Sequence, residues 1–150
     1  MLRSAARLAA TLALLSSAAA LTAGAQSATD QAAVKRAAMD YMDGFYEGDT
    51  AKLVRSLWPE MRKFGYYKGQ NGEYAGSAMP YAAALQFARD VKAGKRTTPP
   101  GAKKEVVVYE VLDQTASVKI SAYWGSDYML LAKQNGQWMI THILWQGPAK

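Results

Sequence analysis

The stretch that decides the fold is residues 105–146, EVVVYEVLDQTASVKISAYWGSDYMLLAKQNGQWMITHILWQ. Apolar and polar residues alternate through most of it, which is typical of strands with one buried face. Asn135-Gly136 lies between two alternating runs and is the strongest short hairpin signal, while Asp113-Gln114 separates two others. The stretch therefore predicts four consecutive strands, at Glu105–Leu112, Thr115–Trp124, Tyr128–Lys133 and Gln137–Trp145.

The residues upstream predict three helices, because apolar side chains recur there at steps of three and four. We expect these helices over residues 30–47, 50–58 and 80–94. Asp49 is a typical N-cap for the second helix, and Pro59 is expected to stop it. A strand at Met61–Lys68, a turn at Asn71-Gly72 and a short returning strand at Glu73–Ala75 complete the prediction.

This order of elements predicts an α+β domain with its helices at the N-terminal side of the chain. Three helices would pack on one face of a curved, mostly antiparallel mixed sheet. A sheet that bends over helices encloses a cavity between the two layers. The sequence therefore predicts a container for a small molecule.

The first 25 residues have the pattern of a signal peptide. Arg3 and Arg7 precede an apolar run from Leu8 to Leu21, which is shorter than the roughly 20 residues of a membrane-spanning helix. Ala23-Gly24-Ala25 then supplies a small-x-small cleavage site, so we expect a mature chain of residues 26–150, exported to the periplasm or secreted from a bacterium. The alternative is an uncleaved N-terminal anchor, although no later stretch is apolar enough to span a bilayer.

Composition bounds the partners of the mature chain. About 125 residues form one ordinary domain, and the absence of cysteine excludes disulfides and a thiol mechanism. Removing Arg3 and Arg7 lowers the formal charge from +6 to +4. The basic residues are scattered, which indicates a solvated surface and not a nucleic-acid site. We expect a small hydrophobic or aromatic partner molecule and no nucleic acid.

Three segments carry a resemblance to a known family. They are DYMDGFYEGDTAKLVRSLW at 40–58, PEMRKF at 59–64, and residues 115–145, which end in a W-x-I-x-x-x-L-W strand. Together they resemble the nuclear transport factor 2-like superfamily and, within it, the SnoaL-like bacterial domains named "putative lumazine-binding". The resemblance implies a cone of curved sheet around helices, a homodimer, and a fold that also hosts isomerases, dehydratases and cyclases.

The chain departs from the family pattern at two positions. Family members often carry His-Pro at the end of the second helix, whereas this chain has Trp58-Pro59. The last strand commonly holds asparagine where His142 stands. If the family histidine takes part in chemistry, this chain lacks it at that place.

Two residues are candidates for catalysis. His142 is the only histidine, and strand alternation predicts that it shares a cavity-facing side with Trp138, Ile140 and Leu144. Burial there would lower its pKa and suit it to act as a general base, unless it is only a hydrogen-bonded wall residue. Asp127 follows Gly125-Ser126 and is either a turn residue or, as the resemblance implies, a cavity carboxylate that moves a proton.

The sequence holds four Trp, nine Tyr and three Phe, all in the predicted mature chain. This number of rings predicts flat pocket walls that suit a planar aromatic or polycyclic ligand. The rings expected to line one pocket are Tyr41, Phe45, Trp58, Phe64, Tyr66, Tyr128 and Trp138. The alternative is that the rings form the core or a dimer interface, with Tyr123 and Trp124 as the interface candidates.

No motif indicates a cofactor or a metal. The chain has no Gly-rich phosphate loop and no His-Glu-x-x-His, and one histidine without cysteine does not make a zinc site. Three hypotheses follow. The first is an exported small-molecule-binding domain that dimerises through the outer face of its sheet. The second is a proton-transfer enzyme with His142 as base and Asp127 as partner. The third is an interaction module that uses that outer face.

Overall fold

Six strands form one mixed sheet, with strand order β2-β1-β6-β5-β4-β3. We describe it in a computed structural model that covers residues 28–148. The β1–β6 pairing is parallel, and the other four pairings are antiparallel. The strands are β1 (Leu57–Lys68), β2 (Tyr74–Ala78), β3 (Glu105–Val111), β4 (Thr115–Ala122), β5 (Gly125–Gln134) and β6 (Gln137–Gln146). The predicted four-strand meander and the α+β class are thus confirmed.

The chain divides into two units, Met1–Ala32 and Ala33–Lys150. The sheet and both hollows described below lie within the second unit. The predicted signal peptide, residues 1–25, lies outside the described residues. No helix in the described part of the chain is long and apolar enough to cross a membrane.

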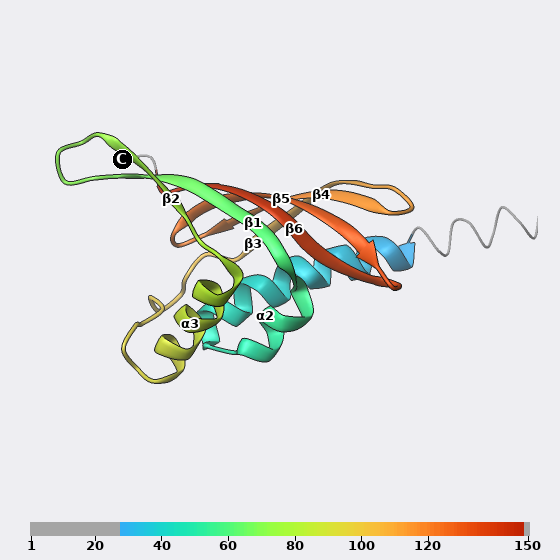
Figure 1. The fold of residues 1–150 in the computed structure, drawn as a ribbon, viewed down its shortest axis with the longest axis horizontal. Helices are drawn as coiled ribbons and strands as arrows, with labels where there is room; N and C mark the ends of the chain where they lie inside the picture. The colour runs from blue at the N-terminus through green and yellow to red at the C-terminus, as the bar shows by residue number, and fades with distance from the viewer. Residues whose placement is uncertain (1–27, 149–150) are drawn as a thin grey trace, which may run out of the picture. The chain divides into compact units, whose positions relative to one another are not determined.

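Helices cover one face of the sheet (Figure 1). The first is described over 28–47, α2 spans Thr50–Ser56 and α3 spans Tyr81–Lys92. The predicted cap of α2 is confirmed, since the Asp49 carboxylate accepts hydrogen bonds from the backbone N–H groups of Ala51 and Lys52 at 2.9 and 3.2 Å. Only two residues separate the first helix from α2, so the chain turns sharply there.

The second helix is shorter than predicted, because β1 already begins at Leu57 and includes Pro59. Proline has no N–H to donate and is confined to edges or irregular places in sheets. Leu57 pairs with Ile140 and Arg62 with His142, so β1 loops out between these pairs, where Pro59 lies. The prediction that Pro59 stops the helix was wrong, because the helix ends at Ser56 and the backbone is already extended at Leu57.

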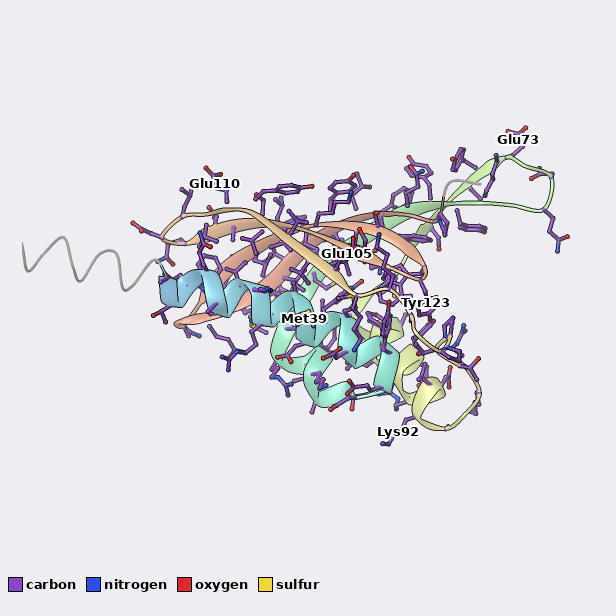
Figure 2. All side chains as sticks on the ribbon, turned by 180° about the vertical axis from the view of Figure 1, so that it is seen from behind. Met39, Glu73, Lys92, Glu105, Glu110 and Tyr123 are labelled. Carbon is purple, nitrogen blue, oxygen red and sulfur yellow. The ribbon has the colours of Figure 1, made fainter. Side chains whose placement is uncertain are left out.

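The buried core lies between the helices and the sheet. Figure 2 shows side chains crowded into this layer, whereas Glu73 marks the tip of the β1–β2 hairpin away from it. The largest fully buried apolar residues of the core come from both the helices and the sheet: Tyr41, Met42, Leu53, Leu57, Ile120, Met129, Leu131 and Ile140. Burial of such side chains stabilises the fold by about 1.5–3 kcal/mol each relative to exposure.

The β5–β6 turn has the geometry that its sequence predicts. Asn135 has φ 50° and Gly136 has φ 81°, so both residues lie in the left-handed region. A two-residue hairpin turn of type I′ requires positive φ at both central positions, which asparagine and glycine adopt most readily. The turn therefore sets the register of β6 against β5.

A bulge in β6 reverses which side chains point toward the helices. Leu131 pairs with Ile140 and Leu130 with His142, so Thr141 is an extra residue without a partner in β5. Before the bulge Ile140 is buried, and after it Ile143 is buried while His142 and Leu144 are exposed. Simple alternation from Trp138 therefore fails at the position of the only histidine.

Candidate functional site

An apolar pocket of about 250 Å³ opens between the first helix, α3 and one end of the sheet. This volume is slightly below the roughly 300–1,000 Å³ typical of ligand sites. Its lining residues are Phe45, Lys63, Ser77, Ala78, Met79, Ala83, Phe87, Tyr123, Trp124 and Trp145. These lining residues come from helices and strands that are far apart in the sequence, from Phe45 to Trp145.

Aromatic rings in edge-to-face contact form the pocket walls. The Phe45 ring centre lies 5.3 Å from that of Phe87 and 5.6 Å from that of Trp124, with interplanar angles of 73° and 66°. Tyr41 packs on the other side of Phe45 at 5.0 Å. Each such contact adds about 0.5–1.5 kcal/mol beyond the buried area, so the walls are rigid surfaces.

Tyr46 holds the pocket rim in place. Its hydroxyl donates a hydrogen bond to the Lys103 carbonyl at 2.5 Å and accepts one from the Tyr123 N–H at 3.1 Å. Its ring lies 5.3 Å from Trp124, edge to face. The rim residues Tyr123 and Trp124, which we predicted for a dimer interface, thus line the pocket and pack against its walls.

Asp127 is the centre of a buried polar cluster beside the pocket. It is fully buried, and its Oδ2 accepts hydrogen bonds from the Tyr41 hydroxyl at 2.7 Å and from Lys63 Nζ at 3.2 Å. Its Oδ1 accepts a bond from Trp124 Nε1 at 2.8 Å. Asp127 lies within β5, near its start, and its side chain faces the helices. It is therefore a core carboxylate and not a turn residue.

Lys63 supplies the positive charge of this cluster. Its side chain is 6 % exposed, and its Nζ lies 2.5 Å from the Tyr41 hydroxyl as well as within reach of Asp127. The rings of Tyr41, Phe45, Trp124 and Trp145 surround Nζ at 5.2 to 6.0 Å from their centres. Aromatic faces attract a cation, so the ammonium is held by one carboxylate and four rings.

Burial shifts the pKa values of two cluster members. Desolvation lowers the pKa of Lys63 from its ordinary 10.5, and the Asp127 carboxylate opposes part of this effect. Desolvation, followed by the charge and hydrogen bond of Asp127, raises the pKa of Tyr41 well above 10.0. Tyr41 therefore stays protonated and acts as a hydrogen-bond donor across the physiological range.

Trp145 lies flat across β1 because Gly65 leaves room for it. A Cβ atom at Gly65 would lie 2.1 Å from the Trp145 carbonyl oxygen and 2.3 Å from ring atom Cδ1. The two residues are register partners in the parallel β1–β6 pair. The Trp145 Nε1 is buried, and it has no hydrogen-bond acceptor among the described residues.

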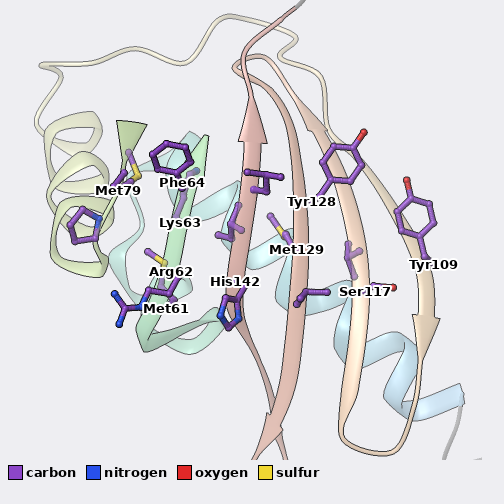
Figure 3. Close-up of a pocket in the computed structure, with 16 residues that line it drawn as sticks. Met61, Arg62, Lys63, Phe64, Met79, Tyr109, Ser117, Tyr128, Met129 and His142 are labelled. Carbon is purple, nitrogen blue, oxygen red and sulfur yellow. The ribbon is translucent and has the colours of Figure 1, made fainter. Parts of the chain in front are cut away.

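A larger hollow of about 680 Å³ lies on the sheet face turned away from the helices. Figure 3 shows Phe64, Tyr109, Tyr128 and His142 spread over this outer face on four different strands, with the helices behind the strands. The hollow is wide, and its outermost apolar side chains have about half of their surface exposed: Phe64, Tyr109, Tyr128, Leu130 and Leu144. The smaller pocket is the better candidate for a ligand site, because rings enclose it and two buried donors line or adjoin it.

The seven predicted pocket rings do not gather at one site. Phe64, Tyr66 and Tyr128 were wrongly placed, since they lie on the outer face with 44 %, 44 % and 50 % of their surface exposed. β1 alternates as predicted but in the opposite phase, with Met61, Lys63 and Gly65 turned inward.

The other four predicted rings lie on the helix side. Tyr41, Phe45 and Trp138 are buried in the core, and Trp58 is partly buried against it. Of these four, Phe45 alone lines the pocket directly. The alternative that many rings form core thus describes Tyr41 and Trp138 better.

The predicted placement of His142 in the cavity was also wrong. The bulge at Thr141 turns His142 to the outer face, where it is exposed and its Nδ1 lies 3.1 Å from the Thr141 hydroxyl. Asp127 faces the helices, so the structure does not bring the two predicted catalytic residues together. The base and its proposed partner lie on opposite faces of the sheet.

Sequence reasoning missed Lys63, which it counted among the scattered surface charges. The alternation of Met61, Lys63 and Gly65 with aromatic residues favours the aromatic face as the buried one, because lysine is rarely buried without a partner. That partner, Asp127, lies in a distant strand. Only the pairing of strands reveals the cluster.

Among residues 28–148, no group of three or more His, Cys, Asp or Glu side chains is placed to hold a metal ion. The donors available near the pocket are one ammonium, one indole N–H and the hydroxyls of Ser77 and Tyr123. These groups suit an organic ligand with hydrogen-bond acceptors.

The family model described as "Putative lumazine-binding" matches residues 29–146. The chain belongs to this family. The match covers all six strands and the helices described above, so the family assignment rests on the whole domain. No curated protein matches the chain.

Solved structures with the same fold are distant in sequence. An NTF2-like protein of unknown function from Shewanella baltica OS155 has a TM-score of 0.64 at 16 % identity, covering 82 % of this chain and 97 % of that one. One from Silicibacter pomeroyi DSS-3 gives 0.61 at 15 %, covering 81 % and 98 %. A "putative scytalone dehydratase" from Novosphingobium aromaticivorans DSM 12444 gives 0.57 at 14 %, covering 82 % and 87 %. These similarities establish the nuclear transport factor 2-like fold alone.

Proposed function

We propose that this protein binds a small, flat, largely apolar molecule in the pocket lined by Phe45, Phe87, Trp124 and Trp145. The observation that carries the proposal is an apolar cavity of about 250 Å³ enclosed by aromatic rings. Rings bind flat ligands by stacking and by edge contacts. The volume favours a ligand of one or two rings over the larger polycycles that the aromatic content alone allows.

The family name adds one candidate ligand. Lumazine is a flat heterocycle of two fused rings, and its size and shape agree with the pocket. The name belongs to the family, so for this chain lumazine is a probe to be tested and not an assigned ligand.

Binding is tested with a variant that fills the pocket from the helix side. Ala83 lines the pocket on the exposed side of α3, so Ala83→Phe adds a ring to the cavity without disturbing buried core. Ala82→Phe is the matched control, because Ala82 is exposed on the same helix and does not line the pocket. We expect Ala83→Phe to weaken binding at least tenfold and Ala82→Phe to leave it unchanged.

The assay is tryptophan fluorescence titration with lumazine and with 2-acetylnaphthalene, since Trp124 and Trp145 line the pocket. Native mass spectrometry of protein purified from its own host would reveal a co-purified molecule. The proposal fails if neither probe binds and nothing co-purifies, or if Ala83→Phe binds as tightly as the wild type.

We further propose that the protein is a homodimer through the outer face of the sheet. Large apolar side chains gather there with 44–57 % of their surface exposed: Phe64, Tyr66, Val107, Tyr109, Tyr128, Leu130 and Leu144. An apolar face of this kind marks an interaction surface. Analytical ultracentrifugation should show a dimer in the wild type and a monomer in Tyr128→Glu/Leu130→Glu. A wild type that stays monomeric at high concentration would refute the dimer.

Export remains part of the proposal on the strength of the N-terminal sequence, residues 1–25. We expect the mature chain to begin at Gln26 when the full sequence is expressed in a bacterium. Intact-mass measurement of the periplasmic fraction checks this, and an uncleaved chain in the membrane fraction would contradict it.

A further inference from the structure

We propose that the pocket selects neutral ligands that carry a carbonyl group, and that Trp145 Nε1 and Lys63 Nζ donate hydrogen bonds to it. This inference rests on the proposed function, which it narrows from flat apolar molecules to one chemical class. The polar groups of the pocket carry this inference, whereas the aromatic walls carry the proposed function.

Trp145 carries a hydrogen-bond donor that has no partner among the described residues. Trp145 lines the pocket, and its Nε1 is buried with no acceptor among the described residues. A buried donor without a partner costs about 1–3 kcal/mol. The indole packs closely on β1 at Gly65, its register partner, where a Cβ atom would lie 2.3 Å from Cδ1. A ligand acceptor in the pocket would satisfy it.

The second step is the remaining proton of Lys63. An ammonium has three protons, and the described partners of Nζ are Tyr41 and Asp127. Lys63 also lines the pocket, and its Nζ lies 5.8 Å from the centre of the Trp145 ring. The two donor side chains therefore lie next to each other in the wall of the same pocket.

The third step is charge. The ammonium of Lys63 is already balanced by Asp127, 3.2 Å away, so the cluster is neutral as a whole. Arg96 lies 4.6 Å over the Phe87 ring at the rim, is half exposed, and has Asp90 4.0 Å away. An anionic ligand would add an uncompensated charge to an apolar pocket, which is costly. A neutral carbonyl accepts the same hydrogen bonds without that cost.

The test compares three naphthalenes that share their rings and differ in one substituent: 2-acetylnaphthalene, 2-naphthoate and 2-ethylnaphthalene. Binding is measured at pH 7.5 by fluorescence titration and calorimetry. We expect the ketone to bind more tightly than the hydrocarbon by about 2- to 12-fold for each hydrogen bond gained. The carboxylate should bind more weakly than the ketone.

The variant Trp145→Phe keeps a ring in the wall but removes the N–H donor. In it the preference for the ketone over the hydrocarbon should fall by about 2- to 12-fold, while hydrocarbon binding changes little. Trp58→Phe is the matched control, since Trp58 does not line the pocket. Its ketone preference should equal that of the wild type.

The outcomes separate this inference from the proposed function. If neither lumazine nor any of the three compounds binds and nothing co-purifies, the proposed function fails. If all three bind equally, if the carboxylate binds best, or if Trp145→Phe keeps the full ketone preference, the pocket is a binding site but the carbonyl inference is wrong.

Discussion

Removing the Asp127 carboxylate should cost far more stability than its single ion pair suggests. Asp127 is fully buried and accepts three hydrogen bonds from side chains. In Asp127→Leu the ammonium of Lys63 stays in an apolar site without a counter-charge. Breaking a buried pair in this way costs about 3–5 kcal/mol. For a domain of this size the loss corresponds to a fall in Tm of about 10–20 °C.

The double variant Lys63→Met/Asp127→Leu tests the reason for that cost. It removes both charges and puts apolar side chains of similar size among the rings. Replacing a buried pair by apolar residues is often neutral or stabilising. We therefore expect the double variant to regain at least half of the stability that Asp127→Leu loses, although Tyr41 and Trp124 also lose their acceptor.

Urea unfolding followed by circular dichroism gives the free energy of unfolding for the wild type, both single variants and the double variant. Asp40→Asn is the control, because Asp40 pairs with Arg55, which is half exposed, and such pairs contribute about 0–1 kcal/mol. The reasoning is refuted if Asp127→Leu costs no more than Asp40→Asn, or if the double variant loses the sum of the two single losses.

Three further predictions concern single features. Gly65→Ala should lower stability by about 1–3 kcal/mol and weaken ligand binding in parallel, because its Cβ displaces the Trp145 ring; unchanged urea curves would contradict this. Asp49→Ala should cost about 1 kcal/mol through loss of the α2 cap, and Asp49→Asn should restore most of it. Wild-type stability should rise with pH between the lowered pKa of Lys63 and 10.5, since the unfolded chain binds the extra proton there, and it should fall above pH 10 as Tyr41 ionises in the unfolded chain only. A flat profile from pH 8 to 11 would contradict both shifts.

The turns and the strand order of the C-terminal third were predictable because their signals are local. Asn135-Gly136 allows few backbone conformations, and it fixes one hairpin without knowledge of anything distant. The cap at Asp49 is equally local. Such features depend on neighbouring residues, so the sequence alone carries them.

The site was not predictable to the same extent, because it depends on the phase of two strands. In β1 the buried face carries Lys63 and Gly65. Burial of Lys63 depends on Asp127 in β5, and Gly65 is needed because Trp145 in β6 packs against it. In β6 the extra residue Thr141 reverses the alternation of buried and exposed side chains, and no residue type at that position predicts a bulge. One-residue shifts move every following side chain to the other face.

The parallel contact between β1 and β6 has a consequence for how the chain folds. β1 pairs with β2 along one edge, but its neighbour along the other edge is the last strand of the domain, so a ribosome must release nearly the whole chain before the sheet can close. Until then, the edge of β1 that faces β6 has no hydrogen-bonding neighbour, and long-range pairing of this kind slows folding. Lys63 and Trp145 lie on those two strands and line the smaller pocket, so this pocket is completed only when β6 joins the sheet. A nascent chain that stalls before β6 would present an open strand edge to chaperones and proteases and would lack the completed pocket.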